Sequence, residues 1–209
     1  MPETALYPRH AEPRLVEALA DSPVVLIHGP RQCGKTTLAR KVGEPRGYAY
    51  VSFDDDVARD AALADPAGFV TDLPDRAILD EVQRVPSLFA ALKSAIDRRR
   101  QPGRFIMTGS ANVLLVPRLS DSLAGRMQII RLHPLTQCEL ARRPAGFLDA
   151  LFGGRFGTRR TERLGGDLAE RIAAGGYPAA LARPAGRRRA APGLTAGTRG
   201  LLGSAALRA

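Results

Sequence analysis

Eight consecutive residues near the start of the chain follow the pattern G-x-x-x-x-G-K-[ST], which restricts the possible folds more than any other feature. Glycines permit the sharp backbone bends that turn the N–H groups of such a loop toward a bound phosphate. The lysine ammonium then binds the β- and γ-phosphates, and the hydroxyl that follows it is a ligand for Mg²⁺. The sequence therefore predicts a phosphate-binding loop with a metal ligand at Thr36. Its expected phosphate-binding residues are Gly29, Pro30, Arg31, Gln32, Cys33, Gly34, Lys35, Thr36 and the adjoining Thr37.

The residues on either side of this run fit the strand–loop–helix arrangement that a phosphate-binding loop requires. Upstream, residues 24–28 form a short apolar run typical of a buried strand, and downstream, residues 36–42 have a composition that favours a helix. Lysine occurs only at positions 35, 41 and 93, so a chance match to the pattern is rare. The alternative, an ordinary glycine-rich turn before a helix, is therefore disfavoured.

The chain alternates between expected strands and expected helices as far as residue 132. This order predicts an α/β fold in which helices cover both faces of a parallel sheet. Residues 57–73 are expected to be helical in two pieces, and Pro86 is expected at the first position of the helix that it begins. The expected strands are 24–28, 48–53, 77–79, 105–107 and 127–132, and the expected helices are 13–20, 36–42, 57–73, 86–100 and 111–119.

Polar segments follow three of these strands at their carboxyl ends, which is where ligands bind in such sheets. Asp80 ends an apolar strand and is expected to hold a Mg²⁺ ion or its water beside the phosphates. Glu81 faces another way and is expected to orient the attacking water or accept its proton. A sensor of the terminal phosphate is expected after the next strand, first at Ser110 and second at Asn112, although capping of the next helix explains both equally well.

Two further residues have a chemical and an ordinary interpretation. Arg126 could neutralise charge that develops on a transferred phosphate, within its own subunit or a neighbouring one, or it could form a structural ion pair. Cys33 lies near a helix N-terminus and Lys35, a position that favours a thiolate, but a small residue at a variable loop position is the simpler interpretation.

Composition indicates a protein of the reducing cytoplasm that attracts polyanions. The net charge of +10 favours nucleic acid or acidic surfaces as partners, although a GC-rich genome would enrich arginine without a functional cause. The two cysteines have no disulfide or zinc spacing, and no stretch is long and apolar enough to span a bilayer. We expect a lead-in at 1–22, a core at 23–145, a partial helical region at 146–183 and a disordered Arg/Ala/Gly-rich tail at 184–209.

Several short segments spread along the chain match one known pattern, at 7–9, 29–38, 78–83, 108–112, 123–126, 132–135, Glu139 and 175–178. Together they resemble the prokaryotic AAA-type ATPases that carry a C-terminal domain of unknown function. The resemblance implies a five-stranded AAA+-like sheet with an extra strand between the phosphate-loop strand and the Asp80 strand. It also implies ATP and Mg²⁺, Walker B roles for Asp80 and Glu81, a sensor near Ser110, and a finger or structural role for Arg126. Because such proteins usually continue into a second domain, the acid-free tail is expected to reflect truncation or a shifted reading frame.

Three functions remain open at this stage. The first is an ATPase that hydrolyses the β–γ phosphoanhydride and forms a homo-oligomer. The second is a P-loop kinase for a small molecule, which the acidic pair at 80–81 disfavours because it suits water as the acceptor. The third is a non-catalytic, nucleotide-gated module that binds DNA or protein through its basic surface.

Overall fold

The computed structural model describes residues 6–110, 123–154 and 165–183. These residues divide into two compact units, with the boundary between Gly146 and Phe147. The first unit contains the sheet and the predicted phosphate-binding loop. The second contains the short helices α8 (Phe147–Phe152), α9 (Gly165–Ala174) and α10 (Pro178–Leu181), which lie in the region expected to be partly helical. The predicted tail at 184–209 lies outside the described residues.

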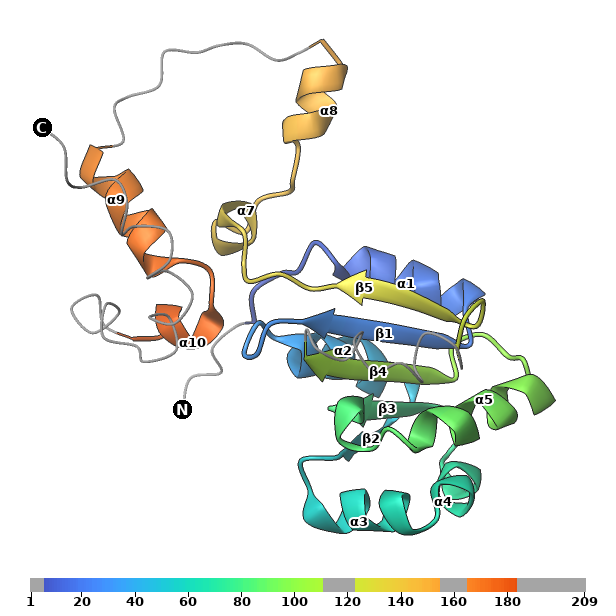
Figure 1. Ribbon diagram of the computed structural model, residues 1–209. Helices are drawn as coiled ribbons and strands as arrows, with labels where there is room; N and C mark the ends of the chain where they lie inside the picture. The colour runs from blue at the N-terminus through green and yellow to red at the C-terminus, as the bar shows by residue number, and fades with distance from the viewer. Residues whose placement is uncertain (1–5, 111–122, 155–164, 184–209) are drawn as a thin grey trace, which may run out of the picture. The chain divides into compact units, whose positions relative to one another are not determined.

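A parallel five-stranded sheet forms the centre of the first unit (Figure 1). Its strands are β1 (Val24–Gly29), β2 (Ala49–Ser52), β3 (Ala77–Asp80), β4 (Phe105–Ser110) and β5 (Met127–Arg131). Their order across the sheet is β2-β3-β4-β1-β5, so β4 separates the phosphate-loop strand from the Asp80 strand. This arrangement confirms the predicted fold class and the extra strand.

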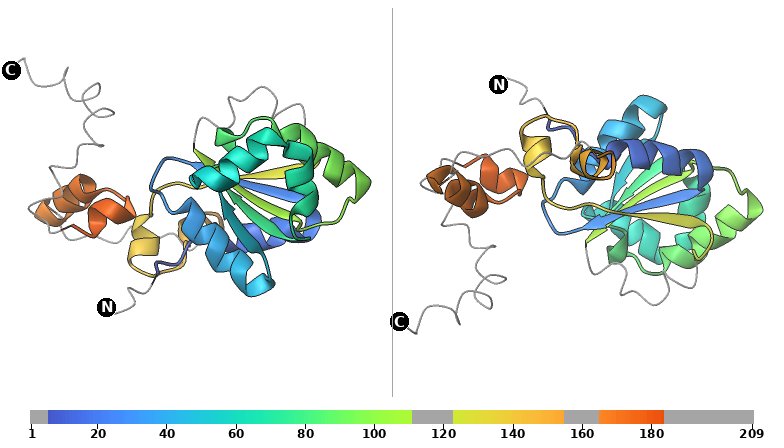
Figure 2. Two further views of the ribbon diagram at one scale, coloured as in Figure 1. Left: turned by 90° about the horizontal axis from the view of Figure 1, so that it is seen from below. Right: turned by 90° about the horizontal axis from the view of Figure 1, so that it is seen from above.

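Helices cover both faces of the sheet, as Figure 2 shows from two further sides. One face packs against α1 (Glu12–Asp21) and α2 (Lys35–Gly43), and the other packs against α3 (Asp56–Ala64), α4 (Pro66–Asp72) and α5 (Leu88–Arg98). All six residues of β1 are buried, because alternate side chains of this central strand enter the two cores. This three-layer α/β/α arrangement fixes the position of the loop that leaves β1.

The predicted break between two helices is correct, and one predicted helix start is wrong. The Asp65 side chain caps α4 by accepting from the N–H of Gly68, and Pro66 occupies the first turn. By contrast, Pro86 lies in a turn and α5 begins at Leu88, since a 3-10 helix at Val82–Arg84 comes first. A short helix that was not expected, α7 (Gln137–Leu140), follows β5. No helix in the described parts of the chain is long and apolar enough to cross a membrane.

Candidate functional site

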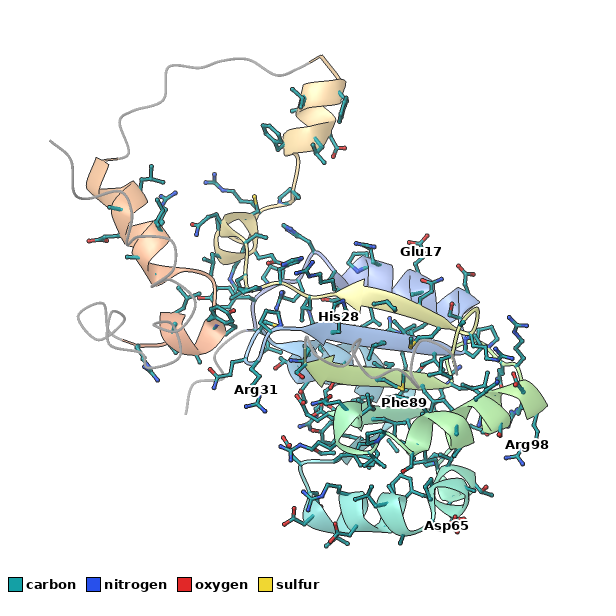
Figure 3. All side chains as sticks on the ribbon, in the orientation of Figure 1. Glu17, His28, Arg31, Asp65, Phe89 and Arg98 are labelled. Carbon is teal, nitrogen blue, oxygen red and sulfur yellow. The ribbon has the colours of Figure 1, made fainter. Side chains whose placement is uncertain are left out.

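The predicted site segments meet at the carboxyl edge of the sheet. Gly29, the last residue of β1, pairs with Ser110, the last residue of β4, and Asp80 ends β3 on the other side of β4. Figure 3 shows Arg31 of the predicted loop at this edge and Arg98, the last residue of α5, at the opposite edge. The parallel sheet therefore brings together residues that are up to 81 positions apart in the sequence, from Gly29 to Ser110.

The predicted loop has the backbone geometry that its glycines were expected to permit. Gly34 has a φ of 97° and Gln32 a φ of 61°, both in the left-handed region. A Cβ atom on Gly29 would lie 2.1 Å from the carbonyl oxygen of Leu132, so only glycine fits where β1 passes the end of β5. The bends place the loop directly before the N-terminus of α2, whose first N–H groups have no partner within the helix.

Lys35 begins α2, and its side chain turns back over the loop. Its ammonium group donates to the carbonyl oxygens of Gly29 at 3.3 Å and Pro30 at 3.0 Å, and the residue is 4% exposed. No carboxylate among the described residues forms an ion pair with it. A buried ammonium group at a helix N-terminus attracts anions, and phosphate oxygens suit this position.

Asp80 is held by three hydroxyl groups from three other elements. Thr36 donates to its Oδ1 at 2.8 Å, Thr108 donates to the same oxygen, and Tyr50 donates to Oδ2 at 3.0 Å. The aspartate is 4% exposed and forms no ion pair among the described residues. Burial raises the pKa of Tyr50, and the charge and hydrogen bond of Asp80 add to this, while a hydrogen bond with Ser52 only partly opposes it, so the Tyr50 hydroxyl stays a donor.

These oxygen atoms are chemically suited to Mg²⁺. The ion prefers hard oxygen ligands, and it is commonly bound by one or two carboxylates together with substrate phosphates. Thr36 and Asp80 supply a hydroxyl and a carboxylate within hydrogen-bond distance of each other. Within the described ranges no group of three or more His, Cys, Asp and Glu residues could hold a metal by itself. The residues present therefore fit an ion that is completed by phosphate.

Glu81 is held in an uncommon backbone conformation beside Asp80. Its φ is 59°, its N–H donates to Thr108 Oγ1 at 3.1 Å, and its carboxylate accepts from the side-chain amide of Gln83. Non-glycine residues in the left-handed region are uncommon and concentrate at functional sites. The Thr108 hydroxyl therefore joins the carboxylate of Asp80 to the backbone of Glu81. Sequence reasoning placed Thr108 near the site but gave it no such role.

The thiolate interpretation of Cys33 is wrong. The side chain is fully buried, and its Sγ contacts the carbonyl oxygen of Leu132 at 3.5 Å. Burial raises the pKa of the thiol, and the nearby charges of Lys35 and Arg9 only partly oppose this. Cys33 therefore packs the loop against the end of β5, and the simpler interpretation of a small structural residue stands.

Arg126 does not reach the phosphate-binding loop of its own chain. It directly precedes Met127, which pairs with Val24 at the amino ends of the strands, whereas the loop lies at their carboxyl ends. Its guanidinium donates to both carboxylate oxygens of Asp97 on α5, with Nη2–Oδ2 at 3.1 Å, and this hydrogen bonding lowers the pKa of Asp97. The structure therefore places Arg126 away from the predicted loop of its own chain, in the ion pair that was the alternative interpretation. The second sensor candidate, Asn112, lies outside the described residues.

Comparison with known proteins identifies a family. The model of the family described as AAA domain matches residues 21–141. Two uncharacterized proteins, one from Mycobacterium tuberculosis and one from Mycobacterium bovis, are each 45% identical over 129 residues. The match covers 61% of this chain but only 29% of each relative, so the chain spans less than a third of their length.

The fold also has a counterpart among solved structures. A Walker-type ATPase of Pyrococcus abyssi superposes with a TM-score of 0.53 at 17% sequence identity. The superposition covers 84% of this chain and 65% of that one. At this identity the likeness establishes a common fold.

Proposed function

This chain belongs to the AAA domain family, and from that premise we propose that it binds ATP and hydrolyses it in the presence of Mg²⁺. The observation that supports the proposal most directly is the 2.8 Å hydrogen bond between Thr36 Oγ1 and Asp80 Oδ1. It joins the end of the phosphate-binding loop to a buried carboxylate from another strand. Because the curated relatives are much longer, the activity of the whole protein is part of the proposal.

The loop and α2 would bind the phosphates. The N–H groups at the start of α2 and the buried ammonium of Lys35 supply positive charge at one position, which suits the β- and γ-phosphates. On phosphate binding, Lys35 would exchange its contacts with the carbonyl oxygens of Gly29 and Pro30 for phosphate oxygens. Thr36 and Asp80 would hold Mg²⁺, and the ion would reduce the negative charge of the triphosphate.

Glu81 would orient the attacking water or accept its proton. It lies one residue beyond the proposed metal ligand, in the left-handed backbone conformation, and its carboxylate accepts from Gln83. The Gln83 amide and the Thr108 hydroxyl restrict its position, which general-base catalysis requires. Ser110, next to Gly29 in the sheet, is our candidate for a contact with the terminal phosphate.

Self-association, nucleic acid as a partner and a cytoplasmic location also remain proposals. Arg126 could act on the site of a neighbouring subunit only after releasing Asp97. The net charge of +10 supports attraction to nucleic acid, and the two free cysteines agree with a reducing compartment.

The test measures ATP binding and phosphate release by the full chain with Mg²⁺. Lys35→Ala should lose both, because the phosphates lose their buried cation. Glu81→Gln should keep ATP affinity while turnover falls by about 10²-fold or more, the usual contribution of a general base. Lys93→Ala, which removes an exposed lysine on α5, is the matched control and should resemble the wild type.

The same measurements separate the alternatives. Wild-type binding without phosphate release would favour the non-catalytic module, and ATP consumption only with an added small-molecule acceptor would favour the kinase. Full turnover by Glu81→Gln would refute the role of that residue. An absence of ATP binding by the wild type would refute the proposed function.

A further inference from the structure

The Arg9 guanidinium connects three segments that are distant in the sequence. It donates from Nη1 to the carbonyl oxygen of Cys33 at 2.7 Å, from Nη2 to that of His133 at 2.5 Å, and from Nε to Glu139 Oε1 at 3.2 Å. Its side chain is only 9% exposed. Cys33 belongs to the phosphate-binding loop, so an arginine outside the predicted site contacts the loop directly.

Glu139 holds this arginine in place. Its side chain is 4% exposed, and it also accepts from the backbone N–H groups of His10 and Thr136, both at 2.8 Å. Burial alone would raise the pKa of Glu139, but the donors from Thr136, His10 and Arg9 outweigh it and lower the pKa. The ionised carboxylate is therefore a fixed point of attachment for the guanidinium.

The contact with Cys33 determines how the next peptide group points. In a planar trans peptide, the carbonyl of one residue and the N–H of the next point in opposite directions. Arg9 holds the Cys33 carbonyl toward itself, so the N–H of Gly34 points away from Arg9. Gly34 also lies against the guanidinium, because a Cβ atom there would be 3.2 Å from Arg9 Nη1.

We propose that Arg9 is a positioning residue that holds the phosphate-binding loop in its anion-binding conformation. It fixes the Cys33 carbonyl on the outer side of the loop, which directs the N–H of Gly34 toward the phosphate. This inference rests on the proposed function for the identity of the ligand. It assigns a role in nucleotide binding to the segment before α1, and Glu139 extends that role to the segment after β5.

To hold the loop, the residue at position 9 needs the planar, forked guanidinium of arginine and not only a positive charge. A lysine at this position keeps the positive charge but cannot reach three acceptors in fixed directions. A long-range effect of charge on the phosphates would be retained in Arg9→Lys and lost in Arg9→Met. A positioning effect would be lost in both variants.

The first experiment measures the affinity of the full chain for ADP with Mg²⁺. Arg9→Lys and Arg9→Met should both weaken ADP binding by about tenfold to hundredfold, the effect of losing one hydrogen bond to a charged group. Arg14→Met is the control for lost charge, and Ile96→Val, on the opposite face of the sheet, is the control for lost stability. Wild-type affinity in Arg9→Lys would overturn the proposal, as would an equal loss in Ile96→Val at a similar melting temperature.

The second experiment tests the contact without nucleotide. Amide hydrogen exchange in the peptide that covers residues 29–36 should be faster in Arg9→Met than in the wild type or Arg14→Met. Unchanged exchange would overturn the positioning role whether or not the protein binds ADP. If the wild type binds no ADP, the proposed function fails, and the exchange result still decides whether Arg9 holds the loop.

Discussion

Replacement of Thr108 by valine should remove the one hydroxyl group that forms hydrogen bonds with both acidic residues of the site. Thr108 is fully buried, and its hydroxyl donates to Asp80 and accepts from the N–H of Glu81 at 3.1 Å. Valine has nearly the same shape, so the change leaves no cavity and removes only the hydroxyl. The affected groups are therefore one carboxylate oxygen and one backbone N–H.

The expected loss of stability depends on which hydrogen bonds Asp80 and the N–H of Glu81 keep in the Thr108→Val protein. Asp80 keeps its donors from Thr36 and Tyr50, so its loss should lie near the lower limit of about 1.5–3 kcal/mol for a hydrogen bond to a charged group. The N–H of Glu81 loses the side-chain acceptor that holds it, and because this hydrogen bond is partly buried, its loss should cost about 1 kcal/mol, the lower limit for an unsatisfied donor. We expect Thr108→Val to lower the free energy of unfolding by about 3 kcal/mol.

Urea unfolding monitored by circular dichroism measures this loss, and phosphate release measures its effect on turnover. Turnover should fall by about tenfold to hundredfold, because Glu81 is no longer held in position. Thr108→Ser keeps the hydroxyl and is the matched control, which should retain most of the turnover. A Thr108→Val protein as stable and active as the wild type would refute the reasoning, and so would equal losses of turnover in the serine and valine variants.

Two other changes test the support of the loop. Gly29→Ala should destabilise the fold by about 1–3 kcal/mol or more, because its Cβ would lie 2.1 Å from the carbonyl oxygen of Leu132. Gly146→Ala, which meets nothing within 4 Å, should be nearly neutral in the same thermal unfolding assay. Glu139→Gln should lower the free energy of unfolding most near neutral pH, because the pKa of Glu139 is lower in the folded than in the unfolded state. The ionised Glu139 stabilises the fold at a pH above its ordinary pKa of 4.5. This stabilisation is lost as the pH falls through the lower pKa that Glu139 has in the folded protein. Urea unfolding from pH 7 to pH 3 should show the difference between the two proteins shrinking, and a constant difference would contradict this assignment.

The sequence was sufficient for the features that depend on local pattern. The run from Gly29 to Thr36 predicted a loop between a strand and a helix, and the structure has β1, the loop and α2 in that order. Asp80 and Glu81 were expected at the end of a strand because an apolar run precedes them. Parallel topology then required that these segments share one edge, so the approximate location of the site followed without coordinates.

Contacts between strands and between distant segments required the tertiary structure. The donation from Tyr50 to Asp80 depends on β2 lying beside β3, which no local pattern specifies. Nor does any local pattern join Arg9 to Glu139, which are 130 positions apart. The position of Arg126 also required the tertiary structure. The Gly125-Arg126 pair in the sequence does not specify which edge of the sheet the arginine occupies.

Pattern in the sequence thus determined which segments are strands, helices and glycine-dependent bends, since these follow from periodicity and backbone sterics within a few residues. Only the tertiary structure decided which side chains hold the acidic residues and the loop in place. The physical reason is that hydrogen bonds to buried carboxylates and carbonyl groups depend on the packing of segments that are not neighbours in the chain. The chemical groups of the candidate site could therefore be predicted, while the contacts that orient them could not.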